Sequence, residues 1–138
     1  MHSRVTPIKM VAGTCLIGLS SLVFAETAPA LQALEKFKSA SQELVRLQSG
    51  IKDAASAKAA QKKIDAATKR QQAADANLTE AMKKLDPGNQ QDAKLMERIY
   101  TDMQAQNEAV ANAQLKAIDV QSAAAEKAAA AKAAHQKQ

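Results

Sequence analysis

Aromatic side chains are nearly absent from this sequence. Only Phe24, Phe37 and Tyr100 occur among 138 residues, and there is no tryptophan. Much of the apolar fraction of 46% is alanine, which buries little area, and burial stabilises by roughly 25 cal/mol per Å². The composition therefore excludes a thick globular core. Long helices that pack closely can still use alanine, the residue with the highest helix propensity.

Proline and glycine are also scarce. The three prolines and four glycines lie mostly near the N-terminus or in one predicted turn. Long stretches are therefore free of helix breakers. The predicted fold class is all-α, an elongated antiparallel helical hairpin or coiled-coil-like three-helix bundle.

The first 25 residues have the three parts of a secretory signal peptide. Arg4 and Lys9 form a positive region, the apolar stretch MVAGTCLIGLSSLVF follows, and Ala25 ends a motif with small residues for signal peptidase. Cleavage after Ala25 would place the mature chain, beginning at Glu26, in the periplasm or outside the cell. The apolar stretch is shorter than the ~20 residues that span a bilayer, so we expect no stable membrane insertion after cleavage.

Few residues in the mature chain can carry chemistry. The single cysteine, Cys15, falls within the signal peptide, so disulfides, thiolate metal sites and thiol catalysis are excluded. His135 is the only remaining histidine, whereas a metal site needs several convergent ligands. Paired acids and a glycine-rich phosphate loop are also lacking. We therefore expect no enzymatic activity, no cofactor, no metal and no small-molecule substrate.

Two turn signals divide the mature chain into three helices. In QSGIKD, Gly50 interrupts the pattern and Asp53 can cap the next helix. In LDPGNQQD, Pro87 and Gly88 stop a helix, and Asn89 is suited to begin another. The bundle is expected over residues 26–124, with helices at about 30–49, 54–85 and 90–124, followed by an alanine- and lysine-rich tail over 125–138. This tail has no apolar stripe, so a helical or disordered spacer is expected.

Apolar and small residues recur at intervals of three and four in each helix, as in coiled-coil seams. The predicted seam positions are Leu34, Phe37, Ser41, Leu44, Gln48 and Ile51 in the first helix, Ile64, Ala67, Gln71, Ala74, Leu78, Ala81 and Leu85 in the second, and Met96, Ile99, Met103, Gln106, Val110, Ala113, Ala117, Val120 and Ala124 in the third.

Charge divides at the second turn. Residues 35–84 have a net charge of +5, and residues 86–126 a net charge of −4. A turn at Pro87 and Gly88 is therefore expected to fold two oppositely charged helices onto each other, with the first helix alongside. Exposed pairs of this kind stabilise by well under ~1 kcal/mol, so the charges are expected to guide orientation more than stability.

Five side chains stand out as candidates for function or specificity. Met82, Met96 and Met103 come together near the predicted turn, and adaptable methionines either form partner surfaces or fill gaps in a core. Gln71 and Gln106 fall on seam positions at similar heights in the hairpin. They either set the register of the two helices or are solvated at the edge of a thin bundle.

A basic sequence raises the question of nucleic acid. Without Arg4 and Lys9 the net charge falls from +5 to +3. The densest basic run, Lys62 to Arg70, has no aromatic residue on which a base could stack. A solvated helix face is the better explanation, and no nucleic-acid partner is expected.

Two segments, GIKDAASAKAAQKKIDAA (residues 50–67) and LMERIYTDMQAQ (residues 95–106), resemble a group of small exported bacterial helical proteins that are uncharacterised. The resemblance covers residues 44–110 and implies a helical exported protein with no particular activity. The tail is similar in composition to the alanine-, lysine- and glutamate-rich helix of a Tol-system protein that spans the periplasm.

The expected function is that of a non-enzymatic interaction or structural protein whose partner is another envelope protein or a second copy. The first alternative is a small periplasmic chaperone-like or envelope-stress protein, although the repeated Leu-Thr-x-x-Gln motif of such proteins is missing. The second is a membrane-active amphipathic protein, for which the aromatics are too few and the apolar stripes too thin.

Overall fold

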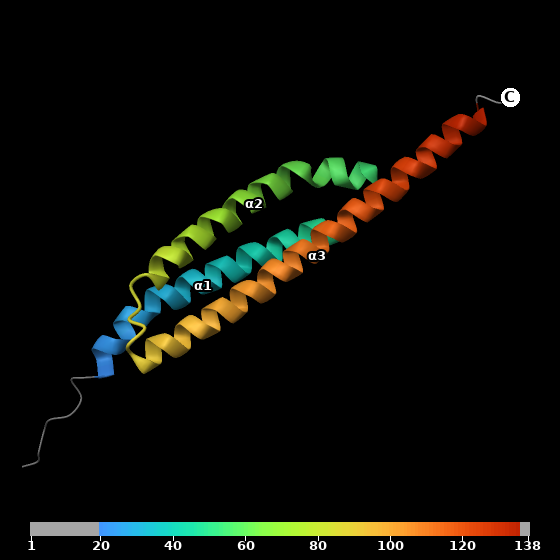
Figure 1. Ribbon diagram of the computed structural model, residues 1–138. Helices are drawn as coiled ribbons and strands as arrows, with labels where there is room; N and C mark the ends of the chain where they lie inside the picture. The colour runs from blue at the N-terminus through green and yellow to red at the C-terminus, as the bar shows by residue number, and fades with distance from the viewer. Residues whose placement is uncertain (1–19, 136–138) are drawn as a thin grey trace, which may run out of the picture.

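Three long α-helices make up the part of the chain that the structure describes (Figure 1). The computed structural model describes the backbone of residues 20–135 and the side chains of residues 27–134. The helices are α1 (Ser20–Ser49), α2 (Ala54–Met82) and α3 (Gln90–His135). Residues 20–135 contain no strand, and the predicted all-α class is confirmed.

The interior helix boundaries follow the turn signals closely. α2 begins at Ala54 and α3 at Gln90, as predicted, while α2 ends at Met82 instead of residue 85. α1 begins at Ser20, ten residues before the predicted start, and contains Pro29. It therefore includes the end of the predicted signal peptide. Residues 1–19 of that peptide lie outside the described residues.

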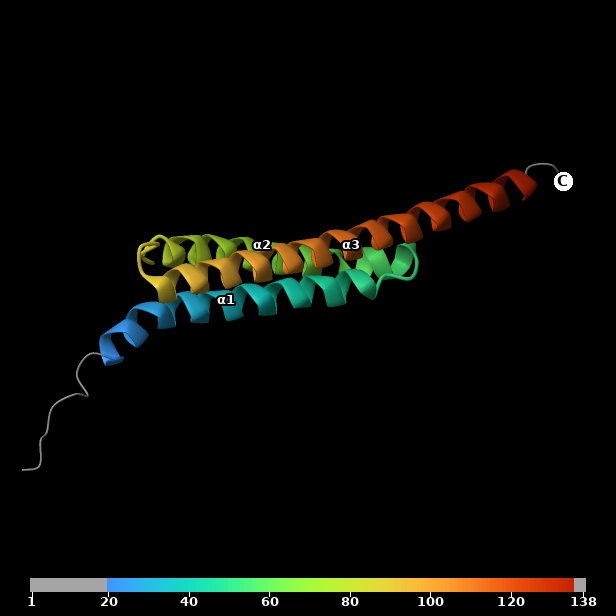
Figure 2. The same ribbon diagram turned by 60° about the horizontal axis from the view of Figure 1, so that its bottom comes forward.

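The central helix is α1, not one of the two helices of the predicted hairpin. α1 packs along both α2 and α3, whereas α2 and α3 contact each other much less. Figure 1 shows α1 between the other two helices, and Figure 2 shows the two connecting loops at opposite ends of the bundle. The chain does reverse between α2 and α3, but the expectation that these two helices pack mainly on each other is wrong.

The reason is the distribution of large side chains. All six seam positions predicted for the first helix are buried, from 0% exposed for Leu34 to 7% for Gln48 and Ile51. Phe37, Leu34 and Leu44 are also three of the five largest fully buried side chains, the other two being Leu78 of α2 and Ile99 of α3. The α2 and α3 seams are rich in alanine, so each gains more apolar contact by packing on α1 than on the other.

Most buried apolar residues of the described chain belong to two clusters. The larger lies toward the α2–α3 loop and contains Ala30, Ala33, Leu34, Phe37, Ala74, Leu78, Met82, Leu85 and Ile99. The smaller lies toward the α1–α2 loop and contains Ile51, Ala57 and Ala117, with Ile64 and Val120 packed against it. Two buried polar side chains of α1, Ser41 and Gln48, stand between the clusters.

The ion pairs between helices also involve α1. Lys38 of α1 lies 3.6 Å from Asp102 of α3, and Arg70 of α2 lies 3.0 Å from Glu43 of α1. No ion pair joins α2 to α3 within residues 27–134. The predicted charge attraction between the second and third helices is thus replaced by separate attractions of each to α1.

Side-chain caps define the start of α2. The Asp53 carboxylate accepts a hydrogen bond from the Ser56 amide at 2.7 Å, and the Ser56 hydroxyl accepts one from the Asp53 amide at 3.0 Å. This reciprocal pair is a capping box. Hydrogen bonds from the backbone and hydroxyl of Ser56 lower the pKa of Asp53 from its ordinary value. The prediction that Asp53 caps the second helix is confirmed.

The α2–α3 loop is held by a network of carboxylate and amide oxygens. Asp86 Oδ1 accepts from the Gly88 amide at 2.8 Å, and the buried Asp92 accepts from the Asp86 amide at 2.9 Å. Asn89 Oδ1 accepts from the Gln91 amide at 2.8 Å and so caps α3. These bonds fix the predicted turn at Pro87 and Gly88.

The predicted tail continues α3 as a solitary helix. α3 has 46 residues, a length of about 69 Å at 1.5 Å per residue, and it passes beyond the ends of α1 and α2 (Figures 1 and 2). Residues 125–134 are all exposed. The tail is therefore helical as far as His135, and no part of the bundle covers it.

Replacing Gln48 should stabilise the bundle. Its Oε1 atom is buried and has no hydrogen-bond partner, and an unpaired buried polar atom costs about 1–3 kcal/mol. Gln48→Leu is therefore expected to raise the free energy of unfolding in urea by about 1 kcal/mol or more. Gln42→Leu, at an exposed position of the same helix, should change it by less than about 0.5 kcal/mol. A Gln48→Leu protein no more stable than the Gln42→Leu control would contradict a destabilising amide at this position of the core.

The capping box predicts a pH-dependent effect of Asp53. Because folding lowers the pKa of Asp53, its contribution is fully present above about pH 4, the ordinary carboxyl range, and is lost as the pH falls through the lowered folded value. Asp53→Ala should lower the melting temperature at pH 7, and the difference from the parent should shrink below pH 4. The control Asp53→Asn keeps a neutral cap and should show no such dependence on pH. Equal Asp53→Ala effects at pH 7 and pH 2.5 would refute the charged cap.

Candidate interaction groove

The three predicted methionines come together between α2 and α3. Met82 of α2 is buried in the larger core cluster, and Met96 and Met103 of α3 are half-buried against it. They line a hollow of about 280 Å³ together with Thr79, Lys83 and Tyr100. The methionines thus fill the core on one side and line an open hollow on the other, and their role as a partner surface stays a prediction.

The hollow continues along α3. A shallower depression of about 720 Å³ is lined by Tyr100, Met103, Gln104, Asn107, Glu108 and Ala111. Because Tyr100 and Met103 line both spaces, they form one continuous feature, which we call the α2–α3 groove. Tyr100, at the centre of the groove, is 59% exposed. Sequence reasoning missed Tyr100, although its position four residues after Met96 and three before Met103 places it on the same side of the helix.

The groove is open because α2 and α3 are both directed toward α1. Between the two apolar clusters, the contact of α2 with α3 is polar. Gln71 Nε2 of α2 lies 3.5 Å from Asn107 Oδ1 of α3 and 3.4 Å from the buried Ser41 hydroxyl of α1. Both distances are long for hydrogen bonds, so this polar layer joins the three helices only weakly.

Gln71 does not pair with Gln106, the partner that the sequence suggested. Gln71 reaches Asn107, the residue next to Gln106, and within residues 27–134 no hydrogen bond joins Gln71 to Gln106. Gln106 is half-buried. The alignment also differs toward the far end, where Ile64 and Val120 pack against the cluster that contains Ala117, whereas a tight hairpin would place Ile64 opposite Val110 or Ala111. Because α2 and α3 each pack mainly on α1, the residues that lie level with each other differ from those of a tight hairpin.

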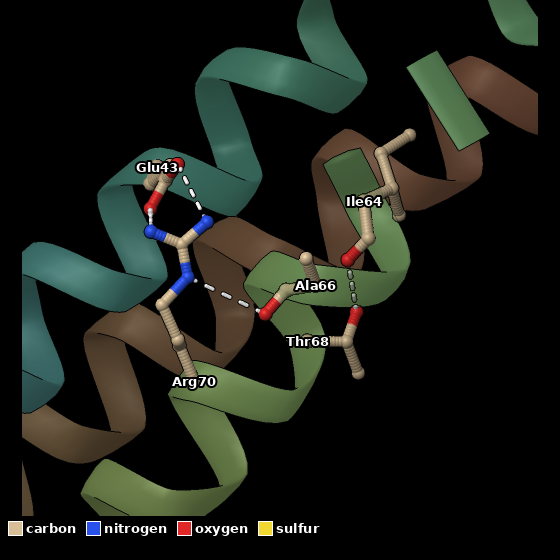
Figure 3. A network of polar contacts seen from close by, with 5 residues as sticks. All are labelled: Glu43, Ile64, Ala66, Thr68 and Arg70. Atoms are coloured by element: carbon tan, nitrogen blue, oxygen red, sulfur yellow. Dashed lines mark hydrogen bonds and ion pairs between the residues drawn. The ribbon is translucent and has the colours of Figure 1, made fainter. Parts of the chain in front are cut away.

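A second open space lies between α1 and α2, on another face. It has a volume of about 530 Å³, and its small side chains are Ser39, Ala40, Ala73 and Ala74. Figure 3 shows Arg70 reaching from α2 to the Glu43 carboxylate, with its Nε atom also donating to the Ala66 carbonyl at 3.4 Å. The residues that line this space include four charged side chains and no methionine or aromatic residue. It is therefore the weaker candidate for recognition.

Residues 27–134 hold no group of three or more His, Cys, Asp or Glu residues close enough to share a metal ion. Hydrogen bonds from Ser56 lower the pKa of Asp53, and a hydrogen bond from Lys83 lowers the pKa of Glu80. Both are exposed and outside the groove. None of the described helices combines the length and the apolar composition that a membrane-spanning segment needs.

Comparison of the chain with protein-family models, with curated proteins and with solved structures finds no match. The geometry of the bundle and its groove is therefore the basis on which a function can be inferred.

Proposed function

We propose that this chain is an exported, non-enzymatic helical interaction or structural protein of the cell envelope. The observation that carries the proposal is the α2–α3 groove, where three methionines and a largely exposed tyrosine line open space. Methionine is flexible and polarisable and adapts to partners of different shape, and tyrosine is enriched at protein interfaces. The signal-like N-terminus supports export to the periplasm, with cleavage after Ala25.

The partner class that suits this groove is a helix from another envelope protein or from a second copy. The groove runs along α3, so an amphipathic helix is the element that would follow it. The solitary end of α3 would act as a spacer that holds the bundle away from whatever the C-terminus contacts.

A chaperone-like function is the second candidate, and the same methionines favour it, because an adaptable apolar groove also suits unfolded clients. The two functions differ in selectivity. A chaperone-like protein should suppress aggregation of an unrelated unfolded client at near-stoichiometric amounts, whereas an interaction protein should not.

Site-specific photo-crosslinking in the producing cell tests the proposal. A benzophenone amino acid in place of Tyr100 should give one predominant adduct with an envelope protein or with a second copy. The same probe at Gln42, an exposed residue of α1 away from the groove, should not. The mass of the adduct also shows whether the chain begins at Glu26. Identical products from both positions, or an adduct with a cytoplasmic protein on a chain that retains Met1, would overturn the proposal.

A further inference from the structure

One face of α3 is patterned like a helix seam but is exposed along its length, although Asn107 on it accepts a long hydrogen bond from Gln71 of α2. Six exposed positions follow one another at intervals of four, three, four, three and four residues, and we call them the outer seam: Tyr100, Gln104, Asn107, Ala111, Gln114 and Ile118. Ile118 is 49% exposed, and Leu115 beside it is 60% exposed. Three of the four large hydrophobic residues exposed within residues 27–134 thus lie on or beside this seam.

The intervals of the outer seam read the same from either end. A face of this kind can pair with itself in the antiparallel direction, because a two-fold contact needs a surface that is complementary to its own reversed copy. With residue 109 at the centre, Tyr100 meets Ile118 of the second copy, Gln104 meets Gln114, and Asn107 meets Ala111. The alternation of four and three residues is also the spacing at which two helices stay in contact along their length.

We infer that the occupant of the α2–α3 groove is α3 of a second copy of this chain, packed antiparallel through the outer seam. The inference deepens the proposed function and rests on it, since it names the partner of the same groove. The groove and the outer seam share Tyr100, Gln104, Asn107 and Ala111. A helix seated on the seam therefore lies over the groove, where it covers the exposed tyrosine and half-buried methionines that α2 leaves open.

The contact is large enough for a weak dimer. In this register residues 90–128 of the two α3 helices overlap, over about 58 Å at 1.5 Å per residue. A strip of that length and about 10 Å width covers about 600 Å² on each copy. The total of about 1,200 Å² is at the lower end of specific interfaces. Contact with α2 across the groove adds to it.

The same arrangement gives the solitary end of α3 a neighbour. An isolated helix shorter than about 12–15 residues is marginal in water, and residues 125–134 are exposed along their whole length. In the antiparallel pair, the overhang of each copy as far as residue 128 lies beside the first turns of α3 in the other copy. Its alanine side chains permit close approach of the two backbones.

Acidic groups on one flank of the outer seam oppose the pairing, and Glu108 is the one nearest the centre. Glu108 is exposed, next to the centre of the seam, so the two copies bring their Glu108 carboxylates close together. Like charges facing each other weaken association. Glu108→Gln should therefore strengthen the dimer, an effect with the opposite sign from that expected for a change that merely damages the helix.

Sedimentation equilibrium with two exposed alanines of α3 tests the inference. The protein used begins at Glu26, and the first buried side chain among the described residues 27–134 is Ala30. Ala111 lies on the outer seam, whereas Ala105, also exposed, lies about 120° away around the helix. Ala111→Glu should weaken the dimer by about tenfold or more, because two further carboxylates meet at its centre. Ala105→Glu should leave it unchanged, and Glu108→Gln should tighten it. Circular dichroism of each variant checks that the helices are intact.

Cysteine pairing then tests the direction. The chain from Glu26 has no cysteine, so a Tyr100→Cys copy mixed with an Ile118→Cys copy should form a disulfide-linked heterodimer. Tyr100→Cys copies on their own should stay unlinked, because the antiparallel pair holds the two cysteines far apart. A parallel pair would bring them together and link them.

Three results would overturn the inference: a monomer at high micromolar concentration, a dimer equally affected by Ala111→Glu and Ala105→Glu, or disulfides between Tyr100→Cys copies in place of the heterodimer. A monomer that still gives one envelope adduct at Tyr100 in the cell would leave the proposed function in place and remove only the second copy as partner.

Discussion

Burial of one face of α1 from two sides is the interaction on which the whole structure depends. Leu34, Phe37 and Leu44 are three of the five largest fully buried side chains, and α2 and α3 reach them from different directions. Because burial area sets the hydrophobic gain, two alanine-rich helices are held by a third that is richer in large residues. The bundle is therefore thin and elongated, and its stability is concentrated in one helix.

The open groove is a direct consequence of this arrangement. Helices that are both directed toward α1 leave little apolar surface for each other, and the layer formed by Ser41, Gln71 and Asn107 joins them with long hydrogen bonds. Met82, Met96 and Met103 can then contribute to the core while part of their surface is open. This open groove is the basis of the proposed interaction function.

The sequence predicts local features well and the choice of partner helices poorly. The caps at Asp53 and Asn89 and the seam of the first helix depend on neighbouring residues, so their patterns are sufficient. The packing of α2 and α3 is predicted wrongly because all three seams have the same period, and opposite charges favour the wrong pair. The larger side chains of the first helix, Phe37 above all, are the available signal for a central α1. The spacing of the methionines identifies them, but Tyr100 is missed, because the groove exists only once α2 and α3 are separated.

Hydrogen exchange of backbone amides tests the central position of α1 most directly. Amides of α1 between Ala30 and Gln48 are flanked by both other helices and should exchange only through global unfolding. Amides of α2 and of α3 up to Ala117 should exchange faster, because each of these helices can detach from α1 by itself, and those beyond Ala124 should be almost unprotected. If the amides of α2 and α3 are instead the most slowly exchanging and those of α1 exchange first, the hairpin of α2 and α3 is the true core, which contradicts the central position of α1.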